Sequence, residues 1–585
     1  MVSGRSIKTD AAVAVAVVLL VSAPMLFTRS GFAEDFTNSM WLVWVAGKSL
    51  VQAGHPGFFI NTSTLGVFYP VFAFYGGPLY AYSGALSELF GGNAEVVFIA
   101  ITMLTIAAVY GSILWLGREF GLRGSIAHAP ALVAVTSAYY MTNLYGRGDW
   151  TELMVTSSLA PLVASGVHLV RAQRWRPLPM AIFVASVVLL TAGHNITLLW
   201  GTTIGAGVLL LLWVAQGAPR SLPYRRMAML LALAAGGVLI NAWFLLPDIA
   251  YAGKVAVAHS EATSTAIWST LKGFNLPGTV LNPLRSVPGE STTPALYVQA
   301  PVWFLAWALL AAALLLWRPA LAGGLRRTWI AATLVVAVLL AMIMVKAFWQ
   351  SVYYPFNEIQ MPYRLATYVF YMTAGLVLVA ALALQRVAGG AGPRTTVAVL
   401  RVALVGAVAI SLALCLWQLW VPNTRFNGSY ADRSAALQSA TVVPTSWYAV
   451  NDYSDWQATI VPVPPGRNLL IPPSAVRGDR FDAWMNVPAG PQPIQTNIAG
   501  GAYLVQIGGL RLVGRNREDL AIVKRIGGGS GPVHVVVETA PGAAVALGRI
   551  VSVVAFLAVL AVLGLAQLRT RQVRRSSRVA LRAPA

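Results

Sequence analysis

Acidic side chains at two places along the chain could accept a proton or bind a substrate. Glu34 and Asp35 are adjacent and follow the first apolar segment. In an extended chain, neighbouring side chains point in opposite directions, so at most one of the two would reach a given substrate. Asp149 and Glu152 are three residues apart and share one face if a helix begins there with Asp149 as its N-cap. The alternatives are solvated loop acids for the first pair and simple helix capping for the second.

Basic and neutral polar side chains supply groups that could bind an anion. His194 and Asn195 interrupt two apolar segments, and a polar pair at membrane depth is costly enough to indicate a function. Hydrogen bonding within a helix turn is the alternative. Glu358 and Arg364 lie where a later apolar run begins, and the planar guanidinium of Arg364 could neutralise a phosphate through two parallel hydrogen bonds. Anchoring of the helix end is the alternative for this arginine.

The composition excludes a water-soluble enzyme as the setting for these residues. The chain has 585 residues, of which 57% are hydrophobic and 10% are charged, whereas about a quarter of the residues are charged in ordinary soluble proteins. The mean hydropathy is +0.67. We therefore predict a polytopic α-helical membrane protein that is large enough to carry an extramembrane domain.

Apolar segments long enough to cross about 30 Å of hydrocarbon occur twelve times. Basic residues cluster in alternate connections between these segments and in the tail, so the net charge of +21 indicates membrane topology and no nucleic-acid partner. The positive-inside rule makes these connections and both termini cytoplasmic. The predicted spans lie near 11–28, 95–116, 126–143, 153–170, 178–193, 196–216, 226–247, 299–317, 328–347, 364–385, 399–420 and 547–567.

Most acidic residues fall on the opposite, outer side. Of the twenty Asp and Glu residues, only Asp10 and Glu119 lie on the predicted cytoplasmic side. Carboxylates beside cations at a membrane surface suit a lipid-phosphate substrate, whose headgroup must be held while a sugar leaves it. The candidate residues that map to outer ends of spans are Asp35, Arg147, Asp149, His194, Glu358 and Arg364.

Three outer segments are too long to be simple turns, namely 29–94, 248–298 and 421–546. Within the first, 37–54 and 67–90 have the apolar and aromatic patterns of helices that lie in the membrane interface. The third is rich in Pro, Gly, Asn and Asp and contains short alternating runs, which predict a small β domain. The predicted organisation is a transmembrane domain over 1–420, an extracytoplasmic β-rich domain over 421–546, a last helix over 547–567 and a basic cytoplasmic tail over 568–585.

Several motifs, spread over most of the chain, resemble those of a known family. They are EDFTNSMWLVW followed by GHPGFFINTSTLGVFYPVFAFYGGPLYAYSGALS, then NLYGRGDWTELM, GHNI, IQMPYRLA and HVVVETAPGAAVALGR. The chain resembles the GT-C glycosyltransferases, most closely the bacterial membrane proteins called 6-pyruvoyl-tetrahydropterin-synthase-related and their YfhO-type relatives. Those proteins typically show an acid after the first span and a later aromatic-Pro-Leu-Tyr stretch, here Tyr75, Pro78, Leu79 and Tyr80.

The resemblance implies a GT-C-like fold and sugar transfer from a polyprenyl-phosphate donor to a cell-envelope glycan or glycolipid, on the outer face of the plasma membrane. The first-loop acid of the family acts as general base and corresponds to Asp35, with Glu34 as the second choice. Arg364, aided by Arg147 or His194, would stabilise the leaving lipid phosphate. The other residues expected to contact substrate are Asp149, Glu152, Asn195, Glu358, Tyr75 and Tyr80.

Cofactors are not expected. The outer acids leave room for a divalent metal, but no ligand cluster in the sequence demands one. The chain has no nucleotide-binding glycine loop, which agrees with a lipid-linked donor. A transporter or flippase of a lipid-linked or glycan substrate is the competing class, although the sequence shows no inverted repeat and almost no acids within spans. A non-catalytic scaffold for envelope assembly, in which the acids are structural, is the third.

Overall fold

The described part of the chain covers both the apolar helices and the predicted β domain. A computed structural model of the protein describes residues 4–27, 34–62, 66–146, 148–172, 175–215, 224–255, 323–353, 362–391, 394–425, 457–499, 504–518, 520–527, 529–540 and 542–580, together with Leu321 and Phe356. The candidate residues Arg147 and Glu358, the predicted span near 299–317 and most of the outer segment 248–298 lie outside these residues.

Seven described helices are long and apolar enough to cross a membrane, and an eighth span results if one bent pair is counted. The prediction of a polytopic helical membrane protein is thereby confirmed. The seven are α1 (Gly4–Phe27), α5 (Ala94–Glu119), α8 with α9 (Trp150–Ser157 and Leu159–Arg171), α18 (Gly324–Met344), α20 (Ala366–Arg386), α21 (Arg394–Arg425) and α23 (Ala543–Ala580).

The remaining predicted spans with described residues are shorter or broken apolar helices. The bent pair is α12 (Tyr224–Ile240) and α13 (Ala242–Tyr251), with a 72° change of direction near Asn241. The shorter elements are η1 (Ser125–His128) with α6 (Ala129–Val135), α10 (Pro177–Leu190) and α11 (Asn195–Ala215). Three further short helical elements are α7 (Ala138–Met141), the π-helix η2 (Thr142–Gly146) and α19 (Lys346–Ser351).

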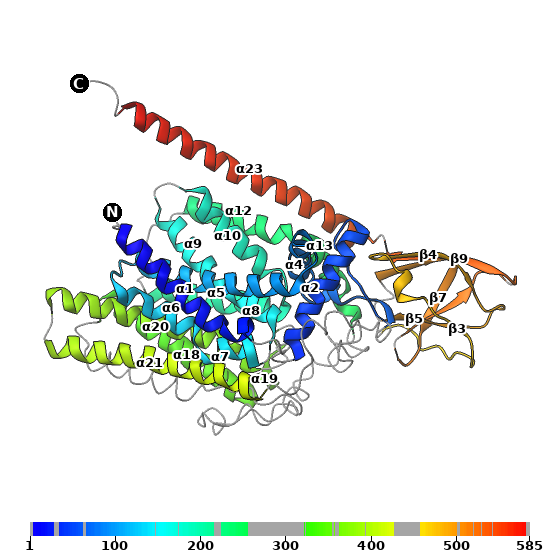
Figure 1. Cartoon of the computed structure of the whole chain (residues 1–585), viewed down its shortest axis with the longest axis horizontal. Helices are drawn as coiled ribbons and strands as arrows, with labels where there is room; N and C mark the ends of the chain where they lie inside the picture. The colour runs from blue at the N-terminus through cyan, green and yellow to red at the C-terminus, as the bar shows by residue number, and fades with distance from the viewer. Residues whose placement is uncertain are drawn as a thin grey trace.

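Burial within the bundle is uneven. In α20, 78% of the most apolar window is buried inside the protein, against 17% in α23. A helix that is apolar all round and buried belongs to the core of a bundle, and α20 has this position. Helix α23 runs along the outside of the bundle, from the β domain to the far end of the molecule (Figure 1).

The first outer segment forms helices that pack against the bundle. Helix α2 (Glu34–Ala53) lies against α4 (Gly77–Leu89), which follows the short α3 (Val71–Phe74). The two helices approach closely because glycines face each other where they cross: a Cβ on Gly47 would lie 2.8 Å from the carbonyl oxygen of Gly84. The structure replaces the single helix that the pattern of 67–90 favoured by strand β2 (Gly66–Tyr69) followed by α3 and α4.

The β domain consists of two sheets that share one apolar core. One sheet has the order β1-β2-β5-β8-β7 with β3 paired to β5, and the other is β4-β9-β6. Two strands of the first sheet come from the first outer segment, since Val67 of β2 pairs in parallel with Ile498 of β5. The strands are β1 (Ile60–Thr62), β2, β3 (Asn468–Leu469), β4 (Arg480–Asn486), β5 (Ile494–Ala499), β6 (Val505–Gly508), β7 (Leu510–Arg515), β8 (Leu520–Arg525) and β9 (Pro532–Thr539).

Ion pairs at the end of the bundle opposite the β domain fix the relative positions of α1, α5 and α9. The Arg118 guanidinium lies 3.0 Å from an Asp10 oxygen, and Nε2 of His128 lies 3.0 Å from the other. Nδ1 of His168 lies 2.7 Å from Oε1 of Glu119. The two acids predicted on the cytoplasmic side are thus both paired with basic residues. Both chain ends lie at this end of the molecule (Figure 1).

Candidate active site

The helix start at Trp150 places two carboxylates in the protein interior. Asp149 caps α8, because its Oδ1 accepts a hydrogen bond of 3.0 Å from the backbone N–H of Glu152. The capping interpretation of Asp149 is therefore correct, yet the residue is 3% exposed, so it does not cap a helix in solvent. The hydroxyl groups of Thr151 and Tyr75 lie 3.0 and 3.5 Å from the same oxygen.

Glu152 is even more enclosed and is held by neutral donors. Its Oε1 accepts 3.0 Å hydrogen bonds from the Tyr139 hydroxyl and from the Asn143 amide. Asn143 lies in the π-helix η2, a rare conformation that is frequent at functional sites. A buried charge is costly unless it is hydrogen-bonded and paired, and these donors meet the first condition.

Arg364 supplies the opposite charge with which these carboxylates pair. Its side chain lies among both carboxylates and an imidazole. It is in the 3₁₀ turn η5 (Pro362–Leu365) that precedes α20. Its guanidinium nitrogens lie 3.8 Å from Oδ2 of Asp149, 3.5 Å from Oε2 of Glu152 and 2.5 Å from Nε2 of His194. The sequence-predicted residues Asp149, Glu152, His194 and Arg364 therefore form one buried cluster, although they come from three separate parts of the chain.

His194 lies between Arg364 and the start of α11. Its Nε2 faces the guanidinium of Arg364 at 2.5 Å. Its Nδ1 accepts a hydrogen bond of 3.2 Å from the backbone N–H of Thr197 and lies 2.6 Å from the hydroxyl of the same residue. The guanidinium of Arg364 faces two carboxylates within this cluster.

Asp149, Glu152 and His194 form a group that could hold a metal ion. One ligand atom each of Asp149, Glu152 and His194 lies within 4.8 Å of the others, and carboxylate with imidazole suits several divalent metals. Arg364 contacts all three side chains. A cation bound between them would have to displace this guanidinium or lie beside it against charge repulsion.

The first turn of α2 lies directly against the loop that carries Asp149. Gly148 has a φ of +68°, and a Cβ added to it would lie 2.7 Å from the backbone nitrogen of Phe36. Phe36 belongs to the turn that begins with Glu34 and Asp35. The two acids thus start a helix, and the expectation that they lie in extended chain with opposite directions is wrong. Successive helical residues are about 100° apart around the axis.

The other predicted site residues divide between this cluster and its surroundings. Tyr75 belongs to the cluster, through its contacts with Asp149 and Thr151. Tyr80 is fully buried, with its ring against Trp150 and its hydroxyl 3.3 Å from Ser39 of α2, so it packs α4 against its neighbours. Asn195 points elsewhere, and its amide donates to Asp248 at 2.9 Å.

Several residues of the cluster were not predicted from the sequence, namely Tyr139, Asn143, Thr151 and Thr197. Tyr139 and Asn143 precede the GDW motif within a mostly apolar segment. Their polarity was the available signal, but it did not reveal a π-helix that turns Asn143 toward Glu152.

Comparison with known proteins gives distant structural likenesses. No protein-family model matches the chain, and no curated protein sequence matches it significantly. The arabinofuranosyltransferase AftD from Mycobacteria is similar at 16% identity and a TM-score of 0.42, over 71% of this chain and 27% of AftD. ArnT from Cupriavidus metallidurans, solved bound to undecaprenyl phosphate, is similar at 14% identity and a TM-score of 0.39, over 91% of this chain and 100% of ArnT.

The chain thus spans about a quarter of the length of AftD. Because both TM-scores lie below 0.5, these likenesses carry no conclusion about function.

Proposed function

We propose that the protein is a membrane glycosyltransferase. It transfers a sugar from a polyprenyl-phosphate carrier to a hydroxyl group of a cell-envelope glycan or glycolipid. The reaction takes place on the side of the membrane where the β domain lies. This side is the outer one, because basic residues concentrate at the opposite end of the bundle, which the positive-inside rule makes cytoplasmic.

The observation that carries the proposal is the contact between Gly148 and Phe36. It brings the first turn of α2, which contains Asp35, against the loop that leads into Asp149. The GT-C resemblance assigns the general base to Asp35 of this turn, and the loop that the turn adjoins leads into the helix start with Asp149 and Glu152. A base and a phosphate-binding cation in one place are what transfer from a lipid phosphate requires.

The reaction is a direct displacement at the anomeric carbon. Asp35 takes the proton of the acceptor hydroxyl, and the acceptor oxygen forms a bond to the anomeric carbon. The bond from that carbon to the phosphate oxygen breaks, and its electron pair leaves with the polyprenyl phosphate. The anomeric configuration is inverted. General-base catalysis of this kind contributes about 10²- to 10⁴-fold to the rate.

Arg364 stabilises the charge that develops on the leaving phosphate. Asp149 and Glu152 orient its guanidinium plane from 3.8 and 3.5 Å, distances at which charge attraction acts without short bidentate hydrogen bonds. His194 supports it from a third direction. The two acids that the sequence suggested as substrate ligands thus act here as positioning residues for Arg364.

Transfer by the purified protein tests this proposal. The full chain in lipid nanodiscs is given polyprenyl phosphates that carry different radiolabelled sugars, together with acceptor extracted from bacterial membranes. We expect label in the acceptor, with inverted anomeric configuration, and the same rate in the presence of EDTA, because Arg364 already lies among the candidate metal ligands.

Two other results would contradict the proposal. If no sugar is transferred while labelled donor crosses the bilayer of proteoliposomes, the protein is a transporter. If neither transfer nor transport occurs while the acceptor is bound, it is a scaffold. Loss of transfer in EDTA, restored by a divalent metal, would contradict the metal-free mechanism alone.

A further inference from the structure

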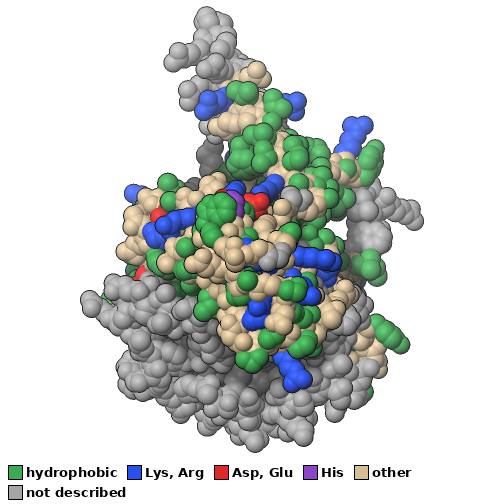
Figure 2. Space-filling model, turned by 90° about the vertical axis from the view of Figure 1, so that its right-hand side faces the viewer, with side chains coloured by type: hydrophobic (Ala, Val, Ile, Leu, Met, Phe, Trp, Pro, Cys, Tyr) green, Lys and Arg blue, Asp and Glu red, His purple; other side chains and the backbone are tan. Residues whose placement is uncertain are grey.

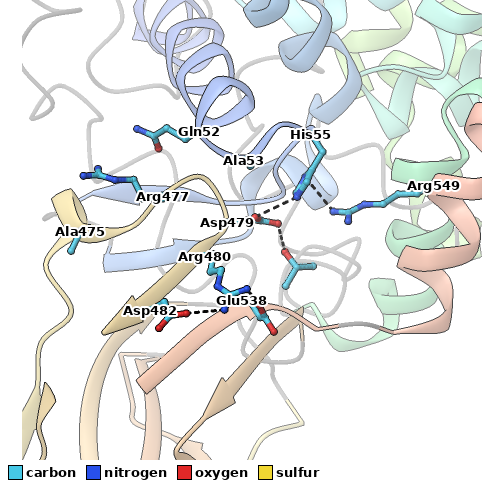
Figure 3. A pocket seen from close by; sticks show the side chains of 11 residues that line it. Gln52, Ala53, His55, Ala475, Arg477, Asp479, Arg480, Asp482, Glu538 and Arg549 are labelled. Carbon is cyan, nitrogen blue, oxygen red and sulfur yellow. Dashed lines mark hydrogen bonds and ion pairs between the residues drawn. The ribbon is translucent and has the colours of Figure 1, made fainter. Parts of the chain in front are cut away.

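A polar cavity lies where the β domain meets the helical part of the protein, at the opposite end of α2 from the loop that carries Asp149. Its volume is about 520 Å³. Three parts of the chain form its walls: the C-terminal end of α2, strands β4 and β9, and the first turns of α23 (Figure 3). No step of the proposed transfer reaction uses its residues.

Close contacts between backbone segments fix the walls of this cavity. Gly478, with a φ of +61°, lies so close to the end of α2 that an added Cβ would be 2.5 Å from the Cβ of Ala53. Its N–H donates to the Gln52 side chain at 2.9 Å, and its carbonyl accepts from Asn61 at 3.2 Å. The cavity is therefore part of the folded structure rather than an accidental gap between two domains.

Hydrogen-bond donors and acceptors are mixed in the lining. Asp479 is buried, accepts from the Thr539 hydroxyl at 2.7 Å and lies 3.6 Å from His55 (Figure 3). The Arg549 guanidinium lies 3.5 Å from Nδ1 of the same histidine. Arg480 pairs with Asp482 at 2.8 Å and with Glu538 at 3.2 Å.

The charges of the lining balance. Three arginines, including Arg477, face the three carboxylates of Asp479, Asp482 and Glu538. Hydrogen bonds, chiefly from Arg480 and then from His534, hold the pKa of Asp482 below its usual value. The Asp482 carboxylate is therefore ionised at neutral pH and can only accept hydrogen bonds. The arginines of the lining donate hydrogen bonds, its carboxylates accept them, and their charges cancel. Such a lining suits an uncharged ligand whose groups both donate and accept hydrogen bonds, as sugar hydroxyls do.

An exposed tryptophan extends the cavity along the sheet. Trp484 is 71% exposed and lies on the same face of β4 as Arg480 and Asp482, because side chains alternate along a strand. His534 joins it to the cavity: this residue lies 2.7 Å from Asp482, and its ring centroid is 5.2 Å from that of Trp484. Figure 2 shows charged side chains and histidine beside hydrophobic surface on this end of the molecule.

We propose that this cavity and Trp484 form a binding site for a neutral oligosaccharide. The apolar face of a sugar ring packs on the exposed indole, while its hydroxyls bond to the charged side chains of the cavity. Aromatic side chains with a few polar groups placed beside them are the usual components of a small-ligand site. This inference rests on the proposed function, in which the oligosaccharide is the acceptor.

The length of α2 determines how long this acceptor must be. The helix has 20 residues, which corresponds to about 30 Å at 1.5 Å per residue. Asp35 lies in its first turn and Gln52 at its other end. A ligand that fills the outer site and also reaches the base must therefore span several sugar rings, so the acceptor is a polymer or a long oligosaccharide rather than a single sugar.

Binding of neutral hexasaccharides to the full-length protein in nanodiscs tests the site. Hexasaccharides of glucose, mannose, galactose and arabinose are measured separately by surface plasmon resonance. We expect at least one to bind, at least tenfold more tightly than its monosaccharide. Trp484→Ala should raise its Kd at least tenfold, and Asp482→Asn should also raise it.

The control is Leu470→Ala, which removes an equally exposed apolar side chain (67%) elsewhere in the β domain and should leave the Kd within twofold. Asp35→Asn should bind like the parent, which separates this site from catalysis. A sulfated hexasaccharide is measured alongside the neutral ones. The inference is overturned if no neutral hexasaccharide binds, if only the sulfated one binds, or if Trp484→Ala binds like the parent. Binding that depends on Trp484, in a protein that transfers no sugar, would contradict the proposed function alone.

Discussion

Arg364 is the residue that compensates two buried negative charges in the candidate site. Removing a cation that pairs with a buried carboxylate typically costs about 3–5 kcal/mol, so an alanine variant would test stability more than function. Lysine keeps the charge but lacks the planar fork that matches a phosphate. A conservative variant at this position is therefore the informative one.

We expect Arg364→Lys to raise the apparent KM for the polyprenyl-phosphate donor by about tenfold or more, which corresponds to about 1.4 kcal/mol. The unfolding temperature in nanodiscs should change by only a few degrees. Steady-state kinetics with varied donor concentration measures the effect. An unchanged donor KM with a lowered unfolding temperature would make Arg364 an anchor of α20 and not a phosphate ligand.

At the scale of elements, the site depends on how α2 meets the loop before α8. Gly148 allows this approach because it has no Cβ and adopts a left-handed conformation. Any other residue there costs about 1–2 kcal/mol in backbone strain, and its Cβ would push against Phe36.

We expect Gly148→Ala to lower the stability by about 1–3 kcal/mol and the rate of sugar transfer by at least tenfold, because α2 is displaced from the cluster. Thermal unfolding and kcat measure the two effects. Gly111→Ala in α5 is the control, since its Cβ would meet no atom within 4 Å. It should leave the rate unchanged and should not lower the stability, because alanine favours a helix interior over glycine by about 0.5–1 kcal/mol. Parental activity of Gly148→Ala would show that the contact between α2 and this loop is not needed.

Elements were predictable from the sequence where a single local pattern determines them. Apolar length identified the spans, and the spacing of Asp149 and Glu152 identified the start of α8. The pairing of β2 with β5 was not predictable, because it joins residues more than 400 positions apart. The apolar pattern of 37–54 predicted most of α2 (Glu34–Ala53). It did not predict the first turn, because Glu34 and Asp35 are charged and add nothing to that pattern. The meeting of Arg364 with His194 depends on tertiary packing alone.

At the scale of the whole molecule, the two ends of the bundle differ in chemistry. One end holds Asp10 and Glu119, each paired with basic side chains, and both chain termini. The other end holds the buried cluster, the β domain and the polar cavity. This asymmetry agrees with the charge pattern in the sequence. In the proposed function, donor, acceptor and base all meet on one side of the membrane.

An insertion at Gly466 tests this orientation. The residue lies in an exposed turn of the β domain, where nothing lies within 4 Å of an added Cβ. A reporter enzyme that is active only outside the cytoplasm should be active when inserted there, and a cytoplasm-only reporter should be inactive. The opposite pattern would place the β domain inside the cell and exclude an extracytoplasmic acceptor.

The central claim is that Asp35 is the general base of sugar transfer, and the Asp35→Asn variant tests it most directly. The side chains are nearly isosteric, so expression and unfolding temperature should match those of the parent, while the rate of transfer should fall by at least about 100-fold. Glu34→Gln is the control and should keep most of the activity, because the GT-C resemblance assigns the base to Asp35 and makes Glu34 the second choice. Transfer by Asp35→Asn at the parental rate would contradict the account, and activity lost only in Glu34→Gln would move the base to the neighbouring residue of the same turn.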